Sequence, residues 1–195
     1  MSLQDKEKWD NKYLTKKQLL KPRDASSNLK DWISYCGGTN ALDLACGAGR
    51  NSIYLAKSGF DVDALDIAKL ALDTLESEAK QNGLSNKINT FLVDLDAYEI
   101  EKEKYDLIIM TNFLDRSLIE SAKIALKKDG ILFIETYMVS DENEKDSSNS
   151  NNLLKSKELM QTMDDSFDIF YYDEFKNEDY EIYKMEKQVI VAKKV

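Results

Sequence analysis

Two glycines and an aspartate are spaced in this chain as they are in sites that bind a nucleoside. Gly47 and Gly49 follow the short apolar run at residues 41–44, and Asp66 ends a second apolar run about twenty residues further on. The glycines allow a tight turn and let a ligand approach the backbone. A carboxylate at this spacing can accept hydrogen bonds from both hydroxyls of a ribose. The pattern predicts a bound adenosyl group.

A short helix is expected directly after the glycines. Ile53 and Ala56 would pack on a sheet, and Gly59 suits the end of the helix. The free N–H groups at its start would face the loop, where they suit an anionic group such as a carboxylate. The run at 62–65 is expected to be the second strand.

The residues around the glycines bear on the class of ligand. A dinucleotide site calls for a third glycine, in the pattern G-x-G-x-x-G, and Ser52 occupies that position here. This difference argues against a nicotinamide or flavin dinucleotide and favours a ligand with an amino-acid tail. Two roles are open for Asp43, which either fixes the loop or meets the ammonium group of that tail.

The segment from Asp43 to Gly49, together with Asp66, resembles the glycine motif and ribose acid of the class I S-adenosylmethionine-dependent methyltransferases, in the branch of tellurite-resistance-type and related small bacterial methyltransferases. The resemblance covers most of the chain, and the other similar segments are 91–95, 105–116, 126–137, 152–154, 158–159 and 172–174. It implies S-adenosylmethionine as the cofactor, with Asp94 beside the adenine and residues 111–113 beside the transferable methyl group. The motifs, the resemblance and an aromatic pair near the N-terminus together predict the cofactor-binding residues. These are Asp43, Ala45, Cys46, Gly47, Gly49, Asn51, Asp66, Ile67, Asp94, Leu95, Thr111, Asn112, Phe113 and Tyr13.

The expected fold is α/β, a single doubly wound Rossmann-like domain over residues 1–195. Helical patterns alternate with short apolar runs through most of the chain, and no Pro- or Gly-rich linker divides it. The resemblance implies a mostly parallel seven-stranded sheet with an antiparallel final strand. Near the end of the chain, a helix is expected at 153–163 and strands at 167–172 and 180–192.

Residues 1–30 are expected to form an N-terminal helical flap. Trp9 and Tyr13 lie four residues apart, either as ordinary packing of a helix on the domain or as an aromatic flap near the tail of the cofactor. The basic run from Lys6 to Arg23 is interpreted as the solvated face of a helix.

A polar segment at residues 140–152 is expected to be a mobile loop. It follows the fifth predicted strand at the ligand end of the sheet, so a lid over the substrate pocket is the alternative role.

Four side chains after the fourth and fifth predicted strands are candidates for an acceptor pocket. They are Asp115, Arg116, Glu135 and Tyr137. Arg116 is equally suited to a surface ion pair, and Glu135 to a buried acid held by backbone donors. No general base is assigned, so the acceptor atom stays open: an oxyanion or a soft sulfur, selenium or tellurium atom needs no base, whereas a neutral hydroxyl or amine does.

Composition limits the partners and the compartment. The chain has 195 residues, a formal charge of −9, two cysteines and no histidine. The negative charge disfavours nucleic acid and favours a small-molecule acceptor. Neither a disulfide framework nor a typical zinc site can be assembled, so no metal is expected and a reduced, cytoplasmic protein fits. No secretory signal or membrane anchor is expected either, and the oligomeric state stays open.

The function expected from the sequence is methyl transfer from S-adenosylmethionine to a small acceptor by in-line displacement. The alternative is a non-catalytic regulatory protein that binds S-adenosylmethionine or S-adenosylhomocysteine, because a fold alone does not establish a reaction. A nicotinamide-dependent oxidoreductase is a third hypothesis, disfavoured by Ser52 and by the lack of histidine.

Overall fold

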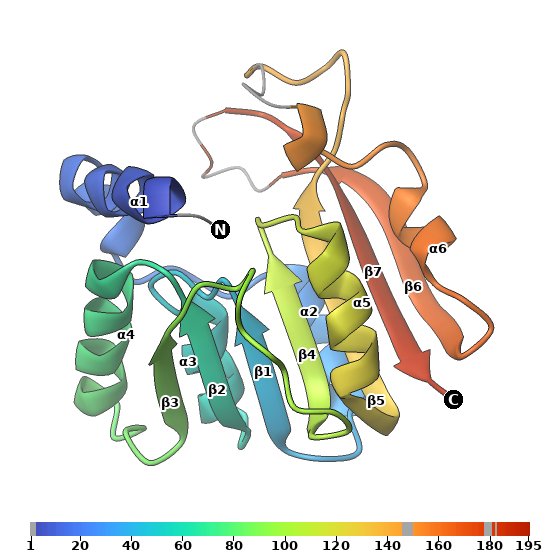
Figure 1. Ribbon diagram of the computed structural model, residues 1–195, viewed down its shortest axis with the longest axis horizontal. Coiled ribbons are helices and arrows are strands. Elements are labelled where there is room, and N and C mark those ends of the chain that lie inside the picture. Colours follow the sequence, from blue (N-terminus) through green and yellow to red (C-terminus); the bar gives the residue numbers. More distant parts are fainter. Residues whose placement is uncertain (1–2, 146–149, 178–180, 182) are drawn as a thin grey trace.

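The computed structural model describes residues 3–145, 150–177, 181 and 183–195, and shows one sheet flanked by helices (Figure 1). Short 3-10 helices lie at residues 17–20, 33–35 and 150–152. The helices and strands are α1 (Leu3–Thr15), α2 (Ser27–Trp32), β1 (Asn40–Leu44), α3 (Arg50–Lys57), β2 (Asp61–Asp66), α4 (Lys69–Gln81), β3 (Ile88–Leu92), β4 (Tyr105–Thr111), α5 (Arg116–Ala125), β5 (Leu126–Tyr137), α6 (Glu158–Thr162), β6 (Phe167–Lys176) and β7 (Glu186–Lys194).

The seven strands lie in the order β3-β2-β1-β4-β5-β7-β6. Neighbouring pairs from β3 to β5 are parallel, whereas β7 is antiparallel to both β5 and β6. The strand order reverses at β1, so the carboxyl ends of β1 and β4 border a crevice where ligands bind in such sheets. The expected α/β class and the antiparallel final strand are confirmed.

Helices cover both faces of the sheet, which explains why most residues of its central strands are buried. On one face, Leu29 of α2, Leu55 of α3 and Leu75 of α4 are buried against the strands. On the other face, Leu118 of α5 and Leu159 of α6 are buried in the same way. Residues 41–44 therefore have no solvated side, as is typical of a parallel strand between two helical layers.

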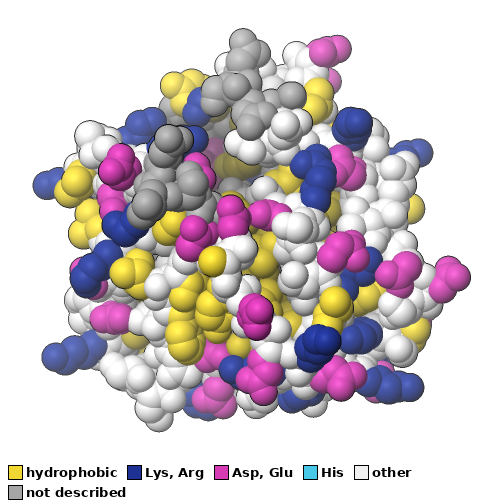
Figure 2. Space-filling view, viewed as in Figure 1, with side chains coloured by type: hydrophobic (Ala, Val, Ile, Leu, Met, Phe, Trp, Pro, Cys, Tyr) yellow, Lys and Arg dark blue, Asp and Glu magenta, His cyan; other side chains and the backbone are white. Residues whose placement is uncertain are grey.

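The connection from β3 to β4 carries no helix and leaves apolar surface in front of the first three strands. Hydrophobic side chains gather there on the face shown in Figure 2. Leu92 is 50% exposed at the end of β3, and Tyr98 and Ile100 are only partly buried. Elsewhere on this face acidic and basic side chains are interspersed.

The N-terminal segment packs beside the carboxyl ends of the strands (Figure 1). Tyr13 of α1 is buried with Ala68 and Ala71, at the start of α4. Helix α1 is therefore joined to the domain through ordinary aromatic packing, and the structure also brings Trp9 close to the crevice.

One late element differs clearly from the sequence-based expectation. The helix expected at 153–163 is wrong over its first half, because Leu154 pairs with Met138 in a bridge that extends β5, and α6 begins only at Glu158. Helix α5 ends at Ala125, since the next residue already pairs with Tyr105 of β4. In the loop expected at 140–152, residues 146–149 lie outside the described residues, so its mobility and its role as a lid stay predictions.

Gly49 is the residue on which the turn from β1 into α3 depends most. Its φ is +78°, and an added Cβ would lie 2.2 Å from Leu75 Cδ1 in the core. We expect Gly49→Ala to lower the free energy of unfolding by about 2–5 kcal/mol, from left-handed strain and overpacking together.

Gly59→Ala is the matched control for this prediction, to be measured by urea denaturation. Its φ is +101°, but an added Cβ would meet nothing within 4 Å. It should therefore cost only the backbone strain, about 1–2 kcal/mol. Equal losses in the two variants would contradict the proposed contact with Leu75.

Candidate functional site

The loop between β1 and α3 has a backbone shape that few side chains tolerate. Ala45, Gly47 and Gly49 all have positive φ, at 57°, 57° and 78°. A Cβ on Gly47 would lie 3.0 Å from the Tyr13 hydroxyl. The glycines therefore keep open a narrow space between the loop and α1, and their backbone is accessible to a ligand.

Asp66 ties this loop to the end of β2. One carboxylate oxygen accepts from Gly47 N at 2.7 Å, and the other accepts from Ala68 N at 2.8 Å. Each oxygen keeps acceptor capacity for a further donor. The side chain is 7% exposed, and burial raises the pKa of this carboxyl.

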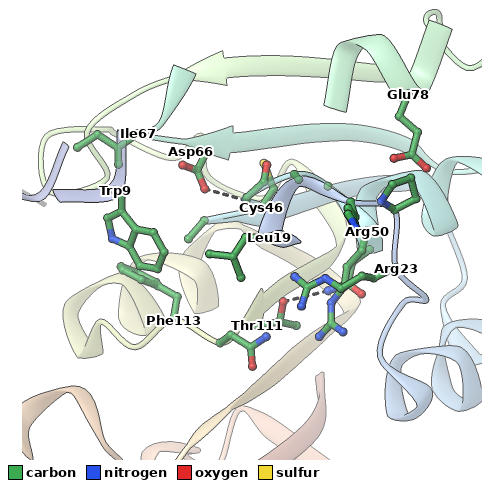
Figure 3. A pocket seen from close by; sticks show the side chains of 18 residues that line it. Trp9, Leu19, Arg23, Cys46, Arg50, Asp66, Ile67, Glu78, Thr111 and Phe113 are labelled. Carbon is green, nitrogen blue, oxygen red and sulfur yellow. Dashed lines mark hydrogen bonds between the residues drawn. The ribbon is translucent and has the colours of Figure 1, made fainter. Parts of the chain in front are cut away.

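A pocket opens above the loop, between it, the N-terminal segment and the end of β4 (Figure 3). In that view Trp9 and Phe113 lie at one end, and Arg23 and Arg50 at the other. The lining residues are Trp9, Leu19, Lys21, Pro22, Arg23, Ala45, Cys46, Gly47, Ala48, Gly49, Arg50, Asn51, Asp66, Ile67, Glu78, Thr111, Asn112 and Phe113.

Most of the predicted cofactor residues line this pocket. They are Ala45, Cys46, Gly47, Gly49, Asn51, Asp66, Ile67, Thr111, Asn112 and Phe113. Asn51 joins two sides of it, because its Nδ2 donates to Thr111 Oγ1 at 2.9 Å. Asn112 lines the pocket, and its buried Oδ1 has no hydrogen-bond partner among the described residues.

The other predicted cofactor residues lie outside the lining. Tyr13 lies against Gly47 on the side of the loop that faces α1, whereas Asp43 lies beneath the loop. Leu95 is a core residue with 4% exposure. Asp94 follows β3 and accepts from Asp96 N at 3.0 Å, in a local turn.

Several lining residues come from parts of the sequence that gave no ligand signal. Lys21 and Arg23 lie after α1, so the interpretation of the basic run as the solvated face of a helix is wrong for them. Pro22 between them is the single proline of the chain, a signal that the helix cannot continue here. Arg50 and Glu78 come from α3 and α4.

The four acceptor candidates are engaged elsewhere. Asp115 caps α5 by accepting from Ser117 N at 2.9 Å and Leu118 N at 3.1 Å. Arg116 donates to Glu158 at 2.6 Å. The buried Glu135 pairs with Lys187 of β7. The Lys187 ammonium group also lies 5.2 Å from the centre of the Tyr137 ring.

Asp43 is held by Ser52, the residue at the position of the third dinucleotide glycine. Ser52 Oγ donates to Asp43 Oδ2 at 2.6 Å, whereas the buried Asp43 Oδ1 has no partner among the described residues. Burial raises the pKa of Asp43 to about 7. The pair fixes α3 under the loop, which favours the structural role left open for this residue.

We expect Asp43 to make stability depend on pH near neutrality. An unfolded Asp has a pKa of about 3.9, so between the two pKa values only the folded protein binds this proton, and stability falls as pH rises. The stability of the wild type relative to Asp43→Asn should fall by up to about 4 kcal/mol from about pH 4 to pH 8. Urea denaturation across this range measures it, and a constant difference would refute the assignment.

Comparison with known proteins agrees with this geometry. The model of the family described as tellurite resistance protein TehB matches residues 4–179. A ubiquinone biosynthesis O-methyltransferase of Actinobacillus pleuropneumoniae is 33% identical over 109 residues, which cover 51% of this chain and 46% of the relative. A probable S-adenosyl-L-methionine-dependent methyltransferase TehB of Haemophilus influenzae is 39% identical over 92 residues, or 46% of this chain and 30% of the relative. The chain thus spans about half or less of these curated relatives.

Solved structures show the same architecture. The crystal structure of TehB from Haemophilus influenzae superposes with a TM-score of 0.76 and 26% identity, covering 88% of this chain and 63% of that one. A methyltransferase from Methanosarcina mazei superposes with a TM-score of 0.69 at 20% identity, over 89% of this chain and 99% of that one. In the described part of the chain, no helix is both long and apolar enough to cross a membrane. Since the family model covers most of the sequence, the chain belongs to the tellurite resistance protein TehB family.

Proposed function

We propose that the protein transfers a methyl group from S-adenosylmethionine to a small-molecule acceptor by in-line displacement. The observation that carries this proposal is the pairing of Asp66 with the glycine loop at one pocket. Family membership and the named methyltransferase relatives support the same activity.

The pocket residues fit the parts of this cofactor. Asp66 would accept from the ribose hydroxyls, and the apolar Ile67 beside it suits the adenine. Arg23 and Arg50, together at one end, suit the carboxylate of the methionine tail. The Asn112 Oδ1 acceptor would meet the ammonium group. Lys21 adds positive charge near the tail, and Glu78 lies at the same border of the pocket.

Catalysis would then depend on positioning. The bound cofactor supplies a positively charged sulfonium that is already an activated leaving group. The chain's own part is to hold the acceptor in line and to exclude water, for which Trp9 and Phe113 provide apolar walls. Asp66 and Glu78 are the only carboxylates of the described pocket lining. We therefore favour an acceptor that is nucleophilic without a general base, such as an anion or a soft chalcogen atom.

Purified protein incubated with labelled S-adenosylmethionine and a cell extract should yield a methylated small molecule that mass spectrometry identifies. Asp66→Ala should lose this activity and bind S-adenosylhomocysteine about tenfold to a hundredfold more weakly, because it lacks the ribose acceptor. Asp61→Asn is the control, since Asp61 begins the same strand and only pairs with Lys87 at the surface. Tight binding without any product would favour the non-catalytic alternative.

A cytoplasmic location of the protein stays a prediction from its composition.

Substitution of Arg23 should weaken binding of ligands that carry the amino-acid tail and spare ligands that lack it. We expect Arg23→Gln to weaken binding of S-adenosylhomocysteine about tenfold or more, because a charge-assisted contact with the carboxylate is lost. Binding of 5′-deoxy-5′-methylthioadenosine, which has no amino-acid tail, should stay unchanged within error. Calorimetry with both ligands measures this, and an equal loss for the two would place the carboxylate elsewhere.

A further inference from the structure

A buried ion pair lies behind the pocket, and neither of its two residues belongs to the pocket lining. Glu135 Oε1 lies 3.2 Å from Lys187 Nζ, and the two side chains are 1% and 0% exposed. Glu135 is near the end of β5, and Lys187 is near the start of β7, the neighbouring antiparallel strand. A charge pair removed from water in this way is stable only when its remaining acceptors find donors.

The N-terminal segment supplies those donors. Ser26 Oγ donates to Glu135 Oε2 at 2.6 Å, and Asn28 Nδ2 donates to the same oxygen at 3.1 Å. These two residues end the strap, the segment of residues 21–28 that leads from the end of the basic run into the first turn of α2. Both carboxylate oxygens of Glu135 are therefore engaged, one by Lys187 and the other by Ser26 and Asn28.

The same strap forms one wall of the pocket. Its residues 21–23 line the cavity. Its Ser26 N donates to Asn51 Oδ1 at 3.1 Å, and Asn51 in turn bonds to Thr111 in the lining. One continuous set of hydrogen bonds thus runs from the buried pair, through the strap, to the pocket.

We propose that Glu135, held by Lys187, is a positioning residue that latches the strap closed over the pocket and thereby sets the affinity for the adenosyl ligand. An open strap would withdraw Arg23 from the carboxylate end and release Asn51 from Ser26. Because only the closed form binds fully, the apparent affinity falls with the closed fraction. The effect on ligand affinity rests on the proposed function, whereas the anchoring of the strap by Glu135 does not.

Hydrogen exchange of peptides covering residues 19–32, with and without S-adenosylhomocysteine, tests the latch. Asn28→Ala removes one strap contact and leaves the ion pair in place. The double variant Glu135→Gln/Lys187→Met removes both charges at similar volume, so no lone charge stays buried. We expect exchange of the strap to be about tenfold faster in Asn28→Ala and faster still in the double variant. The calorimetric Kd for S-adenosylhomocysteine should rise about tenfold in the double variant.

Asp106→Asn is the matched control, because Asp106 pairs with Lys127 at the opposite end of the sheet, 3.0 Å away. It should change neither strap exchange nor ligand affinity. By linkage, saturating S-adenosylhomocysteine should slow strap exchange in Asn28→Ala, which tests the coupling even if the double variant does not fold.

Unchanged strap exchange in Asn28→Ala would overturn the latch, and faster exchange that the ligand fails to slow would overturn its link to affinity. Failure of the wild type to bind the ligand would instead refute the proposed function, while the order of exchange rates without ligand would still test the latch.

Discussion

The carboxylate of Asp66 is the contact on which the site depends. It accepts from the backbone of Gly47 on one side and of Ala68 on the other, so it fixes the glycine loop against the end of β2. Without it the loop, whose residues hold positive φ angles, would keep, among the described residues, only the backbone hydrogen bond from Cys46 N to Leu65 O as a tether to β2. The same two oxygens are the proposed acceptors for the ribose. One residue therefore shapes the pocket and recognises its ligand.

The pocket is held in shape by contacts on several sides. The glycine loop rests on Asp43 and Ser52 below, on Tyr13 above, and on Leu75 of α4 behind Gly49. The strap, anchored by Glu135 and Lys187, forms the opposite wall. Such support explains why several polar residues outside the pocket lining, among them Asp43, Ser52 and Glu135, are buried here. Arg116 forms an ion pair at the surface, which was its alternative role, and Glu135 is a buried acid, held by side chains instead of the expected backbone donors.

The sequence predicted the parts of the fold that depend on local pattern. Gly47, Gly49 and Asp66 identified the crevice, because spacing along a strand, loop and helix is fixed by backbone geometry. Lys21 and Arg23 were missed, since their place in the pocket results from how the strap folds back, which no local period encodes. The helix expected from Leu153 failed for a similar reason: pairing with Met138 outweighs helical propensity there. The partner of Glu135 lies 52 positions away, beyond any pattern in the chain.

The position of β7 has a consequence for how the protein matures. This strand is inserted between β5 and β6, and it carries Lys187, the cation on which the strap's anchor depends. During synthesis β6 leaves the ribosome before β7, and in the described sheet it has no other neighbour with which to pair. Until β7 docks, one edge of β5 and both edges of β6 lack a partner, and unpaired edges favour association with other chains. The binding wall at the beginning of the chain is thus completed only by residues made near its end.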